Sequence, residues 1–433
     1  MITLQDLVQH LSQRSSGAWS VVERVQDIAL AADPPTRQRR DHRTRLTLIV
    51  HQDVPRGRGS ARLDLDPFDG SPGDLVDQAI ALALAAIGPA WTSAPPAAPA
   101  KVELVDPALL ERELGAIALG TLSHLRRPDS LTTTAAIHLL RERVTVTSSA
   151  GFHATWVATA LHGDAVIASR DHSLAISRRA RRADQFDLDA ALADAAGDLA
   201  LLADARPASP GPCSLWLGPE ALLPADAAPL GAPGNLAHGL WTVFAHQADA
   251  TVERQGLTRY RLRAELARGA SQLPEPLSIT SNGALDFALL SVPVTDDAVA
   301  VRSFPIIERG IAVGLGLSPR EAALRTTDPN GGVRNLVVAP GTWSPAPSPT
   351  TRTIEVRRLH AVTVDPYTGD ASLDIALAID HRPGRPPTPF AGGTLRLDLI
   401  ATLARAHRSS HLLRRGAYHG PAAILIDDVE LIA

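Results

Sequence analysis

The chain has little of the chemistry that cysteine and lysine provide. Cys213 is the only cysteine among 433 residues, which excludes an intramolecular disulfide framework and every zinc site built from several cysteines. Lys101 is the only lysine among 42 basic residues, so Schiff-base or P-loop chemistry would depend on this one side chain. Cys213 lies in an apolar stretch without a neighbouring base, which indicates a buried structural thiol.

The sequence also lacks a long hydrophobic run. Its longest apolar stretch, residues 79–87, is far shorter than the ~20 residues that cross a membrane. Residues 1–15 include Asp6 and have no apolar core of the kind that a signal peptide needs. We therefore expect a soluble, cytoplasmic protein with no membrane partner.

The motifs of several enzyme classes are missing as well. No histidine is followed directly by glutamate, so neither an HExxH nor an HExxxH zinc motif can occur. There is no GxSxG nucleophile elbow, no Walker loop and no EF-hand. The glycines of RGRGSAR, residues 56–62, indicate a turn rather than a phosphate cradle. The residues alone thus predict no catalytic residue, no metal ligand and no cofactor site in this chain.

The charge balance argues against a nucleic-acid partner. The 42 basic and 46 acidic residues give a formal net charge of −4. A protein that mainly binds nucleic-acid phosphates would have a clear excess of basic residues. Two arginine clusters, residues 37–45 and 178–182, have no interleaved aromatic residues for base stacking. We interpret them as solvated strand edges, and whether they bind anything stays open.

The chain length and the proline-rich segments near residues 88–100 and 207–212 predict three α+β domains. We expect an N-terminal domain at 1–95, a middle domain at 96–206 and a strand-rich C-terminal domain at 207–433. Apolar periodicity predicts helices at 74–87 and 187–203. Residues 142–177 read as strands that are joined by turns at Ala150-Gly151 and Gly163-Asp164, and 372–379 reads as a strand.

Four polar residues form the clearest candidate site. Carboxylates beside imidazoles suit general acid–base work, and they suit contact with a peptide or partner equally well. The pair Asp296-Asp297 reads most simply as an exposed loop. His407 and His411 are four apart on an expected helix, but the arginines around them oppose a metal ion. The four candidates are His360, Asp365, Asp380 and His381.

The order of several segments resembles the TldD/PmbA family, also called the modulator-of-gyrase family. A strand that runs into Ser149-Ala150-Gly151 resembles its middle-domain pattern, and PCSLWLGPEALL resembles the strand that opens its C-terminal domain. TGDAS at 368–372 and the last residues, GPAAILIDDVELIA, resemble its later turn and its C-terminus. Further matching positions are Asp297, Ile307, Glu308, Gly310, Ala322, Asn335, Leu336, Pro340 and Gly341.

The resemblance is closer to the PmbA (TldE) branch. In this family, the TldD-type subunit carries zinc on an HExxxH helix and a later cysteine, whereas the TldE-type subunit lacks the motif. Here the corresponding segment reads PEALLPADAAPL, residues 219–230, which has no histidine and in which Pro224 and Pro229 would interrupt a helix. The resemblance implies a non-catalytic subunit of a zinc metallopeptidase, with zinc in a TldD-like partner. Its substrates would be short or unfolded peptides, including leader peptides of ribosomal peptide products.

Two alternatives remain open at this level. The chain could be an independent hydrolase that uses the His360, Asp365, Asp380 and His381 cluster. It could also be a nucleic-acid-associated regulator that uses the arginine clusters. Peptide specificity, the identity of the partner and the stoichiometry are not readable from the residues.

Overall fold

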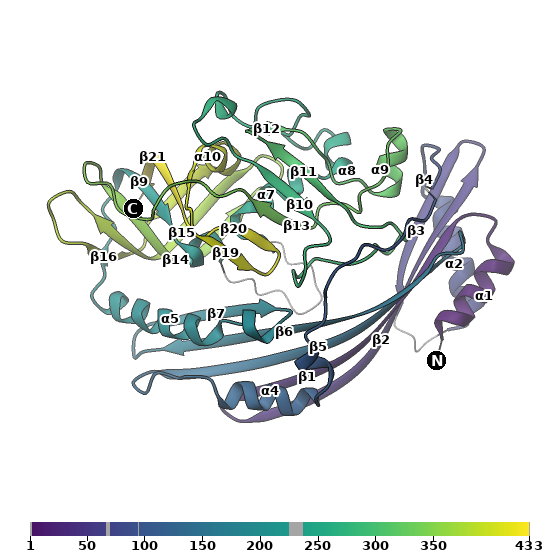
Figure 1. The fold of residues 1–433 in the computed structure, drawn as a ribbon, viewed down its shortest axis with the longest axis horizontal. Coiled ribbons are helices and arrows are strands. Elements are labelled where there is room, and N and C mark those ends of the chain that lie inside the picture. Colours follow the sequence, from purple (N-terminus) through teal and green to yellow (C-terminus); the bar gives the residue numbers. More distant parts are fainter. Residues whose placement is uncertain (1, 66–69, 94, 225–236, 433) are drawn as a thin grey trace.

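The computed structural model describes residues 2–65, 70–93, 95–224 and 237–432. Figure 1 shows a long, twisted sheet with helices beside it, below a strand-rich body that contains the C-terminal half of the chain. The predicted α+β class with a strand-rich C-terminal domain is confirmed.

The N-terminal half forms one antiparallel seven-stranded sheet. Its strand order is β4-β3-β2-β1-β5-β6-β7, and every neighbouring pair is antiparallel. Strands of the predicted first and middle domains therefore share one sheet, while the division at 95 and 206 stays a prediction. The strands are β1 (Trp19–Asp33), β2 (Arg37–Val54), β3 (Gly57–Leu65), β4 (Ile87–Gly88), β5 (Thr132–Ser148), β6 (His153–Ala168) and β7 (Ser173–Ala180).

Helices cover one face of this sheet because alternate side chains on each strand are apolar. Ala29, Ile137, Leu161 and Ile176 point to that face and pack against the helices. The opposite face carries polar side chains and looks toward the C-terminal body (Figure 1). The helices are α1 (Leu4–Arg14), α2 (Pro72–Ala85), α3 (Pro107–Leu110), α4 (Leu114–Ser123) and α5 (Leu188–Ala203), so the predictions for 74–87 and 187–203 are confirmed.

One of the two C-terminal sheets closes on itself. β15 pairs with both β17 and β14, so β14, β9, β21, β17 and β15 form a ring around an apolar core. Short strands β16, β8 and β18 extend this sheet. The strands are β8 (Arg206–Pro207), β9 (Gly211–Leu217), β14 (Thr353–Val364), β15 (Asp370–His381), β16 (Thr388–Ala391), β17 (Thr394–Asp398), β18 (His407–Arg408) and β21 (Ile424–Ile432).

The second C-terminal sheet has six strands in the order β12-β11-β10-β13-β20-β19. Short helices connect the two sheets, and none within the described ranges is long and apolar enough to span a membrane. The strands are β10 (Ile279–Asn282), β11 (Ser303–Glu308), β12 (Ile311–Ala312), β13 (Asn335–Val338), β19 (Leu412–Arg415) and β20 (Tyr418–Pro421). The α-helices are α6 (Pro219–Leu222), α7 (Thr242–Gln247), α8 (Ala250–Arg254), α9 (Pro319–Leu324) and α10 (Leu399–Arg405), and 3-10 turns lie at Ala183–Gln185, Gly239–Trp241 and Ala270–Gln272.

Candidate functional site

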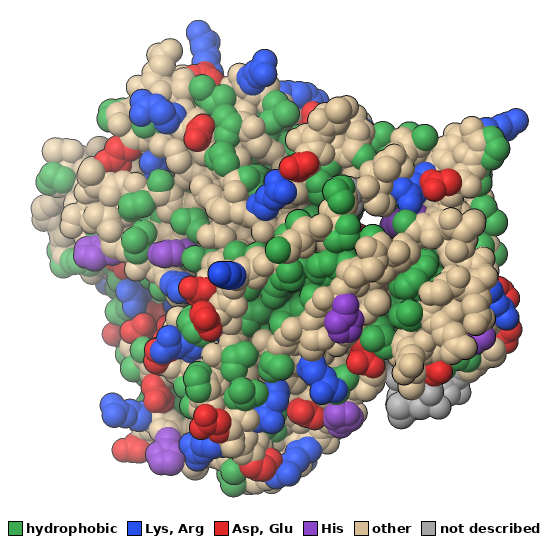
Figure 2. Space-filling view, turned by 45° about the vertical axis from the view of Figure 1, so that its right-hand side comes forward, with side chains coloured by type: hydrophobic (Ala, Val, Ile, Leu, Met, Phe, Trp, Pro, Cys, Tyr) green, Lys and Arg blue, Asp and Glu red, His purple; other side chains and the backbone are tan. Residues whose placement is uncertain are grey.

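A cavity of about 930 Å³ lies between the helix-free face of the seven-stranded sheet and the C-terminal body. Figure 2 shows this side of the molecule, with hydrophobic side chains gathered along the hollow between the two layers. Its volume is at the upper end of the range for ligand-binding clefts, and such clefts occur preferentially at interfaces between structural units. This cavity is the strongest candidate site.

The sheet presents its polar and aromatic side chains to the cavity because of the pairing register. Gln26 lies opposite Glu142, and Glu142 lies opposite Ala158, so side chains from β1, β5 and β6 share one face. The Gln26 amide donates to the Glu142 carboxylate over 2.7 Å. The residues of this wall include Arg24, Gln26, Arg45, Thr47, Arg62, Asp64, Leu140, Glu142, Val144, Trp156, Ser177 and Arg179.

The opposite wall is an apolar segment, residues 289–292, which Arg181 holds in place. Arg181 is buried and donates to the backbone oxygens of Ala288 at 3.0 Å, Leu289 at 2.8 Å and Ser291 at 3.3 Å. Burial lowers the pKa of Arg181 to about 10. Because three carbonyls accept from one guanidinium, this wall is fixed to the end of β7.

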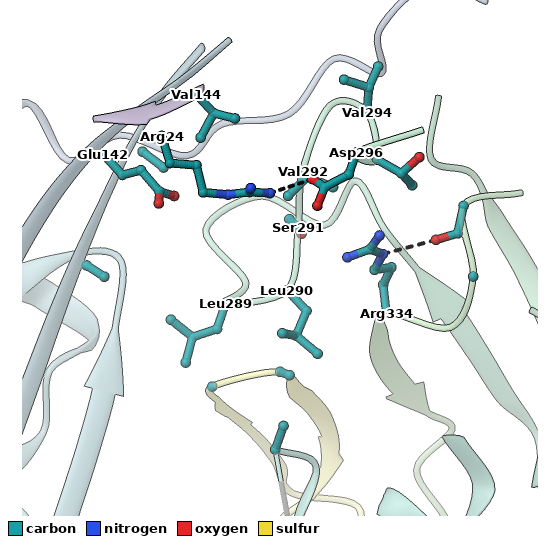
Figure 3. A pocket seen from close by; sticks show the side chains of 18 of the residues that line it. Arg24, Glu142, Val144, Leu289, Leu290, Ser291, Val292, Val294, Asp296 and Arg334 are labelled. Carbon is teal, nitrogen blue, oxygen red and sulfur yellow. Dashed lines mark hydrogen bonds and ion pairs between the residues drawn. The ribbon is translucent and has the colours of Figure 1, made fainter. Parts of the chain in front are cut away.

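Acidic and basic side chains meet at one end of the cavity. Asp296 forms an ion pair with Arg24 of β1, and its other oxygen accepts from Arg62 of β3 at 3.0 Å (Figure 3). Burial, and then the neighbouring Asp296, raise the pKa of Asp297 to about 6. The prediction that Asp296-Asp297 is an exposed loop is therefore wrong, because these residues bridge to the sheet and line the cavity.

Arg334, which immediately precedes β13, points into the same space (Figure 3). Its Nε donates to the Gly331 carbonyl at 3.1 Å, and its backbone N–H donates to Ser281 Oγ at 2.9 Å. Burial lowers the pKa of this guanidinium. Within the described ranges, the two terminal nitrogens of Arg334 have no hydrogen-bond partner, so they are free to meet a ligand.

Behind the cavity, the short helix α6 places Glu220 among three arginines. The Glu220 carboxylate lies 2.6 Å from Arg178, 2.9 Å from Arg415 and 3.2 Å from Arg358. Burial raises the pKa of Glu220, but the three guanidiniums outweigh it and hold the pKa below its usual range. This network ties β7, α6, β14 and β19 together.

The structure does not bring the four sequence-predicted residues into one site. Asp365 is exposed at the turn of the β14–β15 hairpin, where it accepts from the backbone of Tyr367 and Thr368, and His360 is exposed nearby. Asp380 and His381 lie at the other end of β15, about 35 Å along an extended strand. None of the four lines the cavity.

Asp380 and His381 already have partners of their own. Asp380 is buried and binds Arg352 at 2.9 Å and Arg382 at 3.0 Å. His381 lies 3.1 Å from Glu355 and stacks against Trp216. A hydrolase site that needs all four residues together has no support here. A contact of individual members with a peptide or partner stays a prediction.

The arginine clusters are largely engaged within the protein. In the second, Arg178 and Arg181 are buried, so the interpretation of a solvated strand edge is wrong for these two. In the first, Arg39 and Arg43 pair with Asp41, and Arg40 pairs with Glu113. The paired arginine side chains of the first cluster are still 45–69% exposed, so whether this cluster binds a partner stays open.

The remaining candidates are structural. Cys213 is buried in β9 and burial raises the pKa of its thiol to about 11, as expected for an unreactive cysteine. His407 and His411 are not on one helix, because α10 ends at Arg405 and His407 is in β18. Across residues 2–65, 70–93, 95–224 and 237–432, no three His, Cys, Asp or Glu side chains are grouped to hold a metal ion.

Comparison with known proteins supplies the family. The model of the PmbA/TldA metallopeptidase C-terminal domain matches residues 232–433. Residues 232–433 are therefore a C-terminal domain of the TldD/PmbA family. No curated protein matches its sequence.

Three solved structures share the fold of the whole chain. A protein described as a modulator of DNA gyrase from Bacteroides thetaiotaomicron is 14% identical, with a TM-score of 0.79 over 100% of both chains. TldE from Thermococcus kodakarensis is 15% identical, with a TM-score of 0.73 over 99% of this chain and 100% of that one. A second described modulator of DNA gyrase, from Thermotoga maritima, is 14% identical, with a TM-score of 0.75 over 99% and 100%.

Proposed function

We propose that this chain is the TldE-like, non-catalytic subunit of a heteromeric zinc metallopeptidase. A TldD-like partner with an HExxxH motif would supply the zinc, and this chain would help to hold short or unfolded peptides. Leader peptides of ribosomal peptide products are one class of substrate that fits this role. The family membership and the likeness of the fold to a TldE protein support the proposal.

The observation that carries the proposal is the environment of Glu220. The segment Pro219–Pro224, PEALLP, has the spacing of HExxxH with proline in place of each histidine. Proline has no side-chain donor for a metal, and the glutamate between the two prolines is held by three guanidiniums. Positive charge packed around the carboxylate opposes a divalent cation there. Pro229, the other predicted helix breaker, lies outside the described residues.

The cavity supports a role in holding peptides. β7 is an edge strand of the seven-stranded sheet, and its Ser177 and Arg179 side chains line the cavity. An extended peptide could add backbone hydrogen bonds along such an edge while its side chains enter the space beside it. The apolar segment 289–292 on the other wall would give the peptide a surface to bury.

The test is reconstitution with a homologue that carries HExxxH. We expect the two chains to co-elute on size exclusion and to cleave an unstructured fluorogenic peptide, whereas this chain alone gives only the background rate. A chelator should abolish the activity of the pair. Chelator-sensitive cleavage by this chain alone, after purification from a strain that lacks the homologue, would refute the proposal.

A further inference from the structure

Arg334 has no ion-pair partner among the described residues, and it lines the cavity together with the apolar segment 289–292. Its stem packs closely against the backbone, since a Cβ on Gly283 would lie 3.3 Å from Arg334 Cγ. Its Nε is used by the Gly331 carbonyl, which fixes the plane of the guanidinium and leaves its two terminal nitrogens directed at the cavity (Figure 3). A half-buried charge in this state is more favourable when an anion reaches it.

The acidic residues nearby do not satisfy Arg334. The Asp296 carboxylate forms ion pairs with Arg24 and Arg62. Asp297 forms no ion pair within the described residues, and because its pKa is raised to about 6 its carboxyl group gains a proton as the pH falls below neutral. Asp296 and Asp297 attract Arg334 electrostatically, but in the described part of the chain neither forms an ion pair with its guanidinium, which leaves its terminal nitrogens open to an anion.

A second cation, Arg45, adds to the preference of the cavity for an anion. Arg45 lies directly opposite Arg24 in the β1–β2 register, both side chains line the cavity, and Arg45 has no ion-pair partner in the described part of the chain. Like charges on directly opposite residues of two strands are unfavourable. An anion that enters the cavity would relieve this repulsion as well as the burial of Arg334.

The surroundings of Arg334 restrict what kind of anion fits. The neighbouring wall includes Leu289, Leu290 and Val292 (Figure 3). On the sheet side, Val144 and Trp156 also line the cavity. A phosphate or sulfate would use the guanidinium but not this apolar surface. A carboxylate attached to an apolar side chain would use both, through two parallel N–H···O bonds and burial of the side chain.

We infer that this cavity binds the free C-terminal end of a peptide, with the α-carboxylate on Arg334 and an apolar last side chain against residues 289–292. This inference rests on the proposed peptide-holding function and specifies which part of the peptide is recognised. Arg45 adds attraction at longer range, and Arg181 positions the apolar wall.

The test uses the isolated full-length chain and fluorescence anisotropy. The probes are N-terminally labelled six-residue peptides of Gly, Ser and Ala that end in leucine, with either a free carboxylate or a C-terminal amide. We expect the free acid to bind at least about tenfold more tightly than the amide, because the amide forfeits a charge-assisted bidentate contact. A free acid that ends in serine should bind several-fold more weakly than the one that ends in leucine.

Variants separate the contact from general charge. Arg334→Gln should erase the difference between acid and amide, and Arg334→Lys should retain part of it, because lysine keeps the charge but not the planar fork. Arg268→Gln is the matched control, since Arg268 is exposed and outside the cavity. Unfolding midpoints of all variants establish that they are folded.

The protonation of Asp297 gives an independent readout. Asp296 of the same loop, Arg62 of β3 and Arg334 itself face Asp297. As the pH falls from 7.5 to 5.5 this carboxyl gains its proton, while a peptide α-carboxylate stays ionised. The free acid should therefore bind about threefold more tightly at pH 5.5, and Asp297→Asn should remove that change.

Two results would overturn the inference: equal affinities of acid and amide peptides, or an acid preference that survives Arg334→Gln. Absence of binding by either peptide at millimolar concentration would also overturn it. None of these results affects the reconstitution test, which measures cleavage by the pair. Conversely, a peptide preference of the isolated chain could persist even if no pair forms, so the two proposals fail separately.

Discussion

Replacing Glu220 with glutamine should lower the free energy of unfolding by about 3–5 kcal/mol, the range for removal of one partner from a buried ion pair. The reason is that Arg178, Arg358 and Arg415 share the Glu220 carboxylate, and the side chains of Arg178 and Arg358 are only 3% and 8% exposed. Arg178 and Arg415 retain only a weaker contact with Asp187, which is 45% exposed. Arg358 keeps its 2.7 Å ion pair with Asp198, so the neutral amide would leave mainly Arg178 and Arg415 uncompensated.

The measurement is the midpoint of urea unfolding at unchanged slope, compared with a matched surface substitution. Asp184→Asn removes the carboxylate of the Arg182–Asp184 pair, whose side chains are 40% and 58% exposed, and should cost less than about 1 kcal/mol. Equal midpoints for Glu220→Gln and Asp184→Asn would mean that the arginine network contributes nothing to the junction of the two halves.

Substitution of Gly59 by alanine should destabilise the protein by about 3 kcal/mol. Gly59 lies in β3 directly beneath α2, and a Cβ at this position would overlap the carbonyl oxygen of Ala83. That oxygen belongs to the backbone of the helix, so the clash cannot be relieved by a change of rotamer. Helix α2 would have to move off the sheet that forms one wall of the cavity.

Gly197→Ala provides the matched comparison. Gly197 is exposed in the middle of α5, and a Cβ there would meet no atom within 4 Å. Alanine is favoured over glycine in a helix, so this substitution should raise stability by about 0.5–1 kcal/mol. If both substitutions changed the thermal midpoint in the same direction, the packing of α2 against β3 would not be as the structure has it.

Local patterns were sufficient to predict the regular elements. The spacing of Leu188, Leu192, Ala195, Leu199 and Leu202 predicts a helix that the structure has at Leu188–Ala203. These positions share one buried face, so the pattern and the packing have the same cause.

The same approach failed at Gly163-Asp164, where a turn was predicted. Strand β6 runs straight through this dipeptide, and Gly163 pairs with Arg178 of β7. The glycine is needed because a Cβ would collide with Phe186, just before α5, and with Leu188, the first residue of α5. A glycine that makes room for a distant segment has the same sequence signal as a glycine in a turn.

The cavity could not be predicted because its residues come from distant parts of the chain. Arg24 and Asp296 are 272 positions apart, and Arg181 and Leu289 are 108 apart. The four predicted residues were grouped by closeness in sequence, whereas a twelve-residue strand places Asp365 and Asp380 at opposite ends of a hairpin. The adjacent pair Asp296-Asp297 was the local hint at the cavity, and exposed turns also commonly contain such pairs.

Metal analysis of the isolated chain and of the reconstituted pair bears most directly on the assignment of zinc to the partner. Each sample is dialysed against zinc-free buffer and its zinc content is measured by mass spectrometry. We expect no retained zinc in this chain and one zinc per HExxxH-bearing partner in the pair, lost together with peptide cleavage when the two motif histidines of the partner are replaced by alanine. Stoichiometric zinc on the isolated chain, or cleavage by the pair that survives that replacement, would contradict the assignment.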